Sequence, residues 1–252
     1  MKRLDEKRWL MTTTLTTPYI YYNTGPHLAP KAQEYLDAAG KLFEANDPTK
    51  IAEAYKKALE ESPNSPEILS NLGAIMASQG GVQEGVELLK RAIEQGPHCV
   101  GAWYNLGTLF LVHMPGKIAF EHLEKAYELE KKSAPIANNL GIANMHLSRF
   151  DKAAELFQTA IELSPTFDYA HHNLGSVRYD QNRIEEAMHK FHDTLNLNAK
   201  NFATLNDLGC ALYLEGKTDE AIQFFKKSLD ANINYRLPYH NIGYVVYKNG
   251  LV

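Results

Sequence analysis

The sequence lacks the features of a secreted, membrane-spanning or nucleic-acid-binding protein. Its 252 residues include only two cysteines, Cys99 and Cys210, too few and too far apart for a disulfide framework or a zinc site. No apolar run approaches the ~18 residues that a membrane span requires. The net charge of −4 gives no basic excess for binding phosphate backbones. We therefore expect a cytoplasmic protein that neither binds nucleic acid nor inserts into a membrane.

The most informative feature is an internal repeat. A triplet of Asn or Asp, then Leu or Ile, then Gly recurs along the chain, and its glycines lie 34 residues apart at every step. These glycines are Gly73, Gly107, Gly141, Gly175, Gly209 and Gly243. If each glycine is position 8 of a repeat, the repeats begin near residues 32, 66, 100, 134, 168 and 202, and a partial repeat begins at 236. A period of this length predicts stacked helical hairpins.

Other positions of the repeat carry residues of matching size. Position 20 is Gly or Ala from Gly85 onward, position 24 is Tyr, Leu or Phe, and position 27 is Ala, Thr or Ser. At ~100° per residue, positions 4, 7, 8 and 11 share one face of the first helix. Small residues at positions 8 and 20 let the two helices of a hairpin approach closely, and large residues at positions 7 and 24 fill the space around them.

These positions resemble the tetratricopeptide repeat, whose pattern is W-x2-L-G-x2-Y, then A-x3-F, then P. The resemblance covers residues 32–252. It implies an all-α, right-handed α-α superhelix, a solenoid of six full repeats plus a terminal helix. The terminal helix is expected from Arg236 to about Asn249 and is rich in apolar residues. That apolar face favours either self-association, a partner, or a longer protein of which this chain is a fragment.

Residues 1–31 lie outside the repeat register. The stretch from Met11 to Tyr22 is rich in Thr and Tyr and contains Pro18, so it prefers extended conformations to helix. We expect an extended or disordered N-terminal extension. The alternative is a segment that folds back into the groove of the solenoid.

The candidate binding residues occupy position 6, which faces away from the core of its own hairpin. Asn in a helix interior costs about half a kcal/mol relative to Ala, so helix propensity does not explain its recurrence at an exposed position. An amide both donates and accepts hydrogen bonds, so a ladder of amides can bind the backbone of an extended peptide. The ladder residues are Asn71, Asn105, Asn139, Asn173, Asp207 and Asn241, and flanking polar and aromatic residues at positions 5 and 12 are Tyr104, Asn138, His172, Asn206, Tyr179 and Tyr213.

The ladder has two interpretations. It resembles the asparagine ladder of the tetratricopeptide repeats of O-linked N-acetylglucosamine transferase, which implies peptide binding on the concave face. Alternatively, recurrence by duplication leaves amides that bond the neighbouring helix. We predict a protein-interaction scaffold that binds extended peptide segments. The rival hypotheses are a substrate-recruiting or regulatory arm of a larger enzyme, such as a glycosyltransferase or protease, and a self-assembling structural unit.

No catalytic, metal or cofactor site is predicted. The phosphate-loop pattern needs Gly at residue 211, and Ala211 stands there before Gly216-Lys217-Thr218. His189 and His192 lie on one helix, but the repeat geometry predicts no carboxylate or thiol that completes a metal site with them. We therefore expect a protein that is not an enzyme and needs no cofactor.

Overall fold

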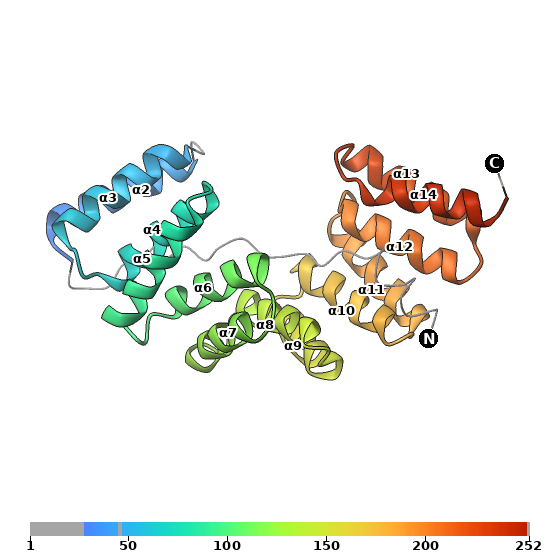
Figure 1. The fold of residues 1–252 in the computed structure, drawn as a ribbon, viewed down its shortest axis with the longest axis horizontal. Helices are drawn as coiled ribbons and strands as arrows, with labels where there is room; N and C mark the ends of the chain where they lie inside the picture. Colours follow the sequence, from blue (N-terminus) through green and yellow to red (C-terminus); the bar gives the residue numbers. More distant parts are fainter. Residues whose placement is uncertain (1–27, 45–46, 251–252) are drawn as a thin grey trace. The chain divides into compact units, whose positions relative to one another are not determined.

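The computed structural model describes residues 28–44 and 47–250, which form thirteen α-helices and no strand (Figure 1). The first helices of the repeats are α2 (Pro30–Glu44), α4 (Pro66–Ser78), α6 (Val100–His113), α8 (Ala134–His146), α10 (Asp168–Asp180), α12 (Phe202–Leu214) and α14 (Leu237–Lys248). The second helices are α3 (Pro48–Glu61), α5 (Val82–Gln95), α7 (Lys117–Leu129), α9 (Phe150–Leu163), α11 (Ile184–Leu197) and α13 (Thr218–Ala231). The predicted N-terminal extension spans residues 1–31. Of these, residues 1–27 lie outside the described part of the chain.

Capping residues explain where several helices begin. The Ser65 Oγ accepts a hydrogen bond from the backbone N–H of Ile68 at 3.3 Å, and Pro66 occupies the first turn of α4. The Asn201 Oδ1 accepts one from the N–H of Thr204 at 3.0 Å. These bonds satisfy N–H groups that have no partner inside the helix, and proline at the first turn loses no hydrogen bond.

The turn inside most hairpins requires a left-handed backbone. The residue at repeat position 15 has a φ of +92° at Gly80, +58° at Ser148, +64° at Asn182 and +77° at Gly216. Glycine adopts this conformation without steric cost, whereas an L side chain there is disfavoured. Repeat three differs because the residue at this position, Met114, has a φ of −144°.

Glycine at position 8 allows the two helices of a hairpin to pack closely. A Cβ atom added to Gly141 would lie 2.6 Å from Cε1 of Phe157, and one added to Gly209 would lie 2.6 Å from Cε1 of Phe225. Both rings are buried. The packing predicted for positions 8 and 24 is therefore the packing observed.

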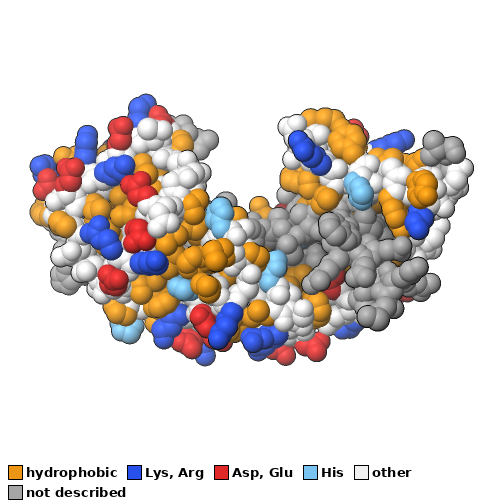
Figure 2. Space-filling view, viewed as in Figure 1, with side chains coloured by type: hydrophobic (Ala, Val, Ile, Leu, Met, Phe, Trp, Pro, Cys, Tyr) orange, Lys and Arg blue, Asp and Glu red, His pale blue; other side chains and the backbone are white. Residues whose placement is uncertain are grey.

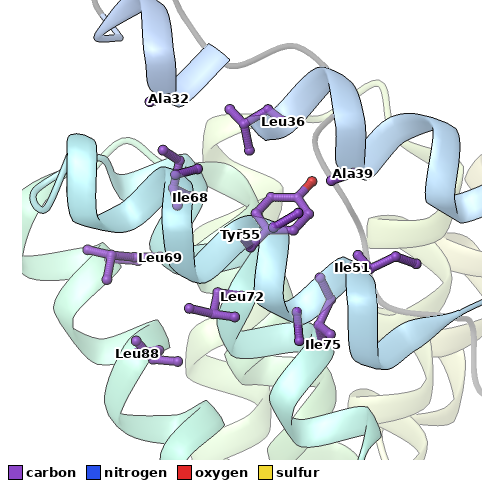
Figure 3. Packing of buried hydrophobic residues seen from close by; sticks show 14 of the residues in the cluster. Ala32, Leu36, Ala39, Ile51, Tyr55, Ile68, Leu69, Leu72, Ile75 and Leu88 are labelled. Atoms are coloured by element: carbon purple, nitrogen blue, oxygen red, sulfur yellow. The ribbon is translucent and has the colours of Figure 1, made fainter. Parts of the chain in front are cut away.

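The helices fall into two compact units, which divide between Lys131 and Lys132. Helices α2–α7 belong to the first unit and α8–α14 to the second. In the first, the core is built where α2 and α3 meet α4, with Tyr55 surrounded by aliphatic side chains (Figure 3). In the second, the rings of Phe191 and Phe225 pack with aliphatic side chains such as Leu208.

Candidate functional site

The position-6 amides of the first unit bond to the preceding repeat. The Asn71 Nδ2 donates to the hydroxyl oxygen of Tyr55 at 3.2 Å, which joins α4 to α3. The Asn105 Nδ2 donates to the Oγ of Ser70 at 3.3 Å, which joins α6 to α4. The second of these bonds links position 6 of one first helix to position 5 of the first helix before it.

The same link recurs in the second unit. The Asn173 Nδ2 donates to Oδ1 of Asn138, and the Asn241 Nδ2 donates to Oδ1 of Asn206, both at 2.8 Å. The position-5 amides also donate within their own helix, from Asn138 to Oδ1 of Asn139 at 3.1 Å and from Asn206 to Oδ1 of Asp207 at 2.9 Å. We use the name amide ladder for a set of side chains at positions 5 and 6. At position 5 these are Ser70, Asn138 and Asn206, and at position 6 they are Asn71, Asn105, Asn139, Asn173, Asp207 and Asn241.

The amide ladder is buried, although position 6 was expected to be exposed. The relative exposures are 0% for Asn71, Asn139, Asn173 and Asp207, 1% for Asn241 and 3% for Asn105. Position 6 of the first repeat, Asp37, is by contrast exposed. Position 6 lies opposite the core of its own hairpin, and it is buried where successive first helices meet. The hydrogen bonds from Asn105, Asn173 and Asn241 match the alternative interpretation, in which the amides bond the neighbouring helix.

A histidine and a carboxylate meet in the buried ladder of the second unit. His172 Nδ1 and the Thr204 Oγ1 share a hydrogen bond of 2.9 Å, and His172 Nε2 lies 3.6 Å from Oδ2 of Asp207. Both side chains are fully buried. The structure thus gives His172, predicted only as a flanking residue, two polar neighbours on the following first helix.

The three predicted tyrosines differ in their exposure. Tyr104 and Tyr179 are fully buried, and burial raises the pKa of the Tyr179 hydroxyl well above its usual range. Tyr213 is half-buried, and its ring lies 6.1 Å, centroid to centroid, from the ring of Tyr244 on the next first helix. Of the three, only Tyr213 offers a partly accessible ring.

Cys210 and Thr204 also belong to this polar network and were missed in the sequence analysis. The Asn241 Nδ2 lies 3.5 Å from Sγ of Cys210. Burial raises the pKa of the Cys210 thiol, so it stays protonated at neutral pH. The 35-residue separation between position 5 and the next position 6, which recurs along the sequence, is the signal that could have identified the bonded pairs.

Buried polar side chains are concentrated on the first helices. Apart from Ser133 in a loop and Thr194 and Ser228 on second helices, every buried polar side chain of the described residues lies on a first helix. Burying a polar group costs free energy unless the group is well hydrogen-bonded. The first helices therefore carry a specialised face, and the second helices do not.

Among the residues that the structure describes, the charged side chains form no comparable feature. Lysine, arginine, aspartate and glutamate are interspersed over the face of each unit that Figure 2 shows. In the described part of the chain, no three His, Cys, Asp or Glu residues are grouped so that they could hold a metal ion. A search of the same residues finds no helix that is long and apolar enough to cross a membrane.

Stacked two-helix repeats with a glycine at the crossing point and a polar row on the first helices define a helical-repeat protein of the solenoid class. Profiles of the tetratricopeptide repeat match residues 42–111, 134–167 and 172–235. The chain belongs to the tetratricopeptide-repeat family, and the predicted all-α repeat fold is confirmed. No curated protein matches the sequence.

Solved structures with the same fold differ widely from this chain in sequence. YrrB, described as a tetratricopeptide-repeat protein with an unusual peptide-binding site, is 20% identical, with a TM-score of 0.58 over 75% of this chain and 98% of its own. The Cut9–Hcn1 hetero-tetramer of APC/C is 16% identical, with a TM-score of 0.79 over 86% of this chain and 43% of the matched chain. The thermophilic protein TTC0263 of Thermus thermophilus is 20% identical, with a TM-score of 0.59 over 72% of this chain and 99% of its own. These similarities support the fold.

Proposed function

We propose that this protein is a non-catalytic interaction scaffold whose first helices bind extended peptide segments of other proteins. The observation that carries the proposal is the amide ladder, whose position-6 members occur in successive repeats along the first helices. Membership of the tetratricopeptide-repeat family supports a role in protein–protein interaction. YrrB, which shares the fold, is a protein with a peptide-binding site.

The ladder suits peptide backbone because each amide has two N–H donors and one acceptor oxygen. The backbone of an extended peptide presents both kinds of group regardless of its side chains. A ladder of amides would therefore contribute affinity while demanding little of the peptide sequence. Specificity would come from neighbouring side chains such as Tyr213, whose ring combines rigid contact area with a hydrogen-bonding hydroxyl.

The orientation of the amides also supports the proposal. The bonds from Asn173 to Asn138 and from Asn241 to Asn206 hold each amide in one direction, so its ordering entropy is already lost before a ligand binds. The Asn241 Oδ1 is a buried acceptor with no partner among the described residues. Because the ladder is buried, a peptide can reach the amides only if the groups that now surround them move away.

The test uses a peptide selected against the protein itself. A random display library of unstructured 12-residue peptides (roughly the length that spans a few repeats, at about 3.3 Å per extended residue) supplies a probe. Fluorescence anisotropy then compares the native chain with the Asn173→Ala/Asn241→Ala variant. We expect the variant to bind the probe more than about tenfold less tightly, the equivalent of about 1.4 kcal/mol.

The control changes exposed polar residues on second helices, as Gln83→Ala/Gln158→Ala. Circular dichroism must show equal helicity for all three proteins. In ¹⁵N spectra, the side-chain NH₂ signals of Asn173 and Asn241 should shift when the probe is added to the native chain. Equal affinity for the native and ladder variants, with unmoved Asn173 and Asn241 signals, would overturn the proposal and leave the ladder a structural feature.

A further inference from the structure

The link between α10 and α12 differs chemically from the other links between first helices described above. In those links, the position-5 side chain of one first helix and the position-6 side chain of the next are neutral, as in Asn138 and Asn173. Between α10 and α12, the same two positions hold His172 and Asp207. This link therefore contains two groups that can gain or lose a proton near physiological pH.

The imidazole of His172 lies between a hydroxyl and a carboxylate. Its Nε2 is 3.6 Å from Oδ2 of Asp207, and its Nδ1 is 2.9 Å from Oγ1 of Thr204. The other carboxylate oxygen, Oδ1, accepts a hydrogen bond from Asn206 at 2.9 Å, which holds the carboxylate in place. The Thr204 hydroxyl can accept a hydrogen bond from a protonated ring or donate one to a neutral ring. The arrangement thus accommodates both forms of the imidazole.

Burial makes the net charge of this pair decisive. Both side chains are fully buried. With one shared proton the pair is neutral, either as imidazolium and carboxylate or as their two uncharged forms. Loss of that proton leaves a buried carboxylate without a countercharge, and burying a single charge costs much free energy. The folded pair therefore holds its shared proton to a higher pH than the ~6.5 at which histidine releases it in an unfolded chain.

The neighbouring groups do not titrate in the same range. Burial raises the pKa of the Cys210 thiol on α12 and of the Tyr179 hydroxyl on α10, and the charge of Asp207 contributes to both shifts. Both groups thus stay protonated at neutral pH. The charged side chains of α9, α13 and α14 are exposed, and α8 contains no Asp, Glu, Lys or Arg. The half-buried charged or histidine side chains of α10 and α11 are Asp168, His171, Arg178, Asp180, Lys190 and Asp193.

We propose that the proton shared by His172 and Asp207 holds α12 against α10, and that its release as pH rises gives a peptide access to the adjacent amides of the ladder. This regulation rests on the peptide site proposed above. Asn173 and Asn206 are the sequence neighbours of the pair, and all four side chains are buried, so the contacts that keep the pair closed also cover these amides.

The direction of the effect follows from where the proton is bound. Below ~6.5, histidine holds the proton whether the link is closed or open to water, so the link has its full strength. Above this value an opened link releases the proton, whereas the closed pair retains it. The free energy of opening therefore falls as pH rises, and a peptide that must open the link binds more tightly.

The first test compares the native chain with His172→Asn/Asp207→Asn. This double change introduces the pair of side chain types found at Asn138 and Asn173, so the link keeps hydrogen-bonding groups but loses its titrating ones. Urea denaturation is followed by circular dichroism at about pH 6 and about pH 8, on either side of the ~6.5 of histidine. The folding equilibrium constant of the native chain should fall between these values at least about threefold more than that of the double variant.

The matched control is His189→Asn, which also removes a histidine beside a carboxylate. His189 is 73% exposed, and its Nδ1 lies 3.4 Å from Oδ2 of Asp193. This variant should retain the pH dependence of the native chain. Equal pH dependence in the native chain and the double variant would overturn the role of the shared proton, and this result does not depend on any peptide.

The second test concerns access to the ladder. The probe is a peptide from the display library that has no Asp, Glu or His and is acetylated at its N-terminus, so its own charge does not change. The native chain should bind it at least about threefold more tightly at the higher pH than at the lower. The double variant should bind it equally at both.

The outcomes separate this regulation from the peptide site itself. Equal affinity of the native chain at both pH values, with the expected change in stability, would overturn the control of access and leave the peptide site intact. Unmoved signals of the ladder amides on addition of the probe would overturn the peptide site and the control of access together. The urea measurement would still decide whether the shared proton holds α12 against α10.

Discussion

Asn173 donates a hydrogen bond from its Nδ2 to Oδ1 of Asn138 at 2.8 Å, and this bond joins two successive first helices across 35 residues of sequence. Both side chains are fully buried. The amide at Asn173 thus stabilises the stacking of repeats as well as offering a candidate contact to a peptide. The two roles can be separated, because stability is measured without any ligand.

Asn173→Ala should lower the free energy of unfolding by about 1–3 kcal/mol, because the buried Oδ1 of Asn138 then loses a donor. Urea denaturation followed by circular dichroism measures this change. Gln158→Ala, at an exposed position of α9, serves as the control and should change the stability by less than about 0.5 kcal/mol. An Asn173→Ala chain as stable as the control would show that the bond contributes nothing to stacking.

Gly209→Ala and Gly243→Ala should change the stability in opposite directions. A Cβ at Gly209 would lie 2.6 Å from the Phe225 ring, and overpacking of this kind costs about 1–3 kcal/mol. A Cβ at Gly243 meets nothing within 4 Å, so the helix gains about 0.5–1 kcal/mol from the replacement of glycine. The melting temperatures of the two variants test this directly. A shift of both in the same direction would contradict the assignment of Gly243 to an uncovered face.

Ser148→Gly should stabilise the second unit by up to about 1 kcal/mol. Ser148 has a φ of +58°, a conformation that disfavours an L side chain by roughly 1–2 kcal/mol, and the greater flexibility of glycine in the unfolded chain offsets part of the gain. Thermal unfolding measures the result. Met114→Gly is the contrasting variant, because Met114 occupies the same repeat position with a φ of −144°, and this change should destabilise the protein by about 0.5–1 kcal/mol.

Stability should fall with rising pH in alkaline solution, in part through Cys99. Burial raises the pKa of the Cys99 thiol to about 11, whereas in an unfolded chain it lies near ~8.5. Between these two values, the unfolded chain loses a proton that the folded chain retains, so stability decreases as pH rises. The difference in melting temperature between pH 8 and pH 10 (roughly the window set by those values) should be smaller for Cys99→Ala. Equal differences would show that Cys99 does not contribute.

Much of the fold could be predicted because its determinants are local and repeat along the chain. First helices begin at Pro66, Val100 and Ala134, where the 34-residue period places the start of a repeat. The small residue at position 8 and the large one at position 24 belong to the same hairpin, so their contact follows from helix geometry alone.

The candidate site could be predicted only in part. The residues at position 6 were identified from their recurrence, but their burial was not, because it depends on how closely successive first helices approach. The bonded partner of Asn105, Ser70, and the neighbours of His172 also lie on adjacent repeats. A periodic pattern shows which residues are equivalent and does not show the distances between equivalent helices.

The sequence by itself determined the repeat length, the hairpin packing and the identity of the polar row, because each depends on residues within one repeat. Only the tertiary structure decided which equivalent residues have different surroundings. Gly209 and Gly243 occupy the same repeat position, yet Phe225 covers the first and nothing approaches the second within 4 Å. The physical reason is that a residue's neighbours come from packing between helices, and packing differs along the stack even where the sequence repeats.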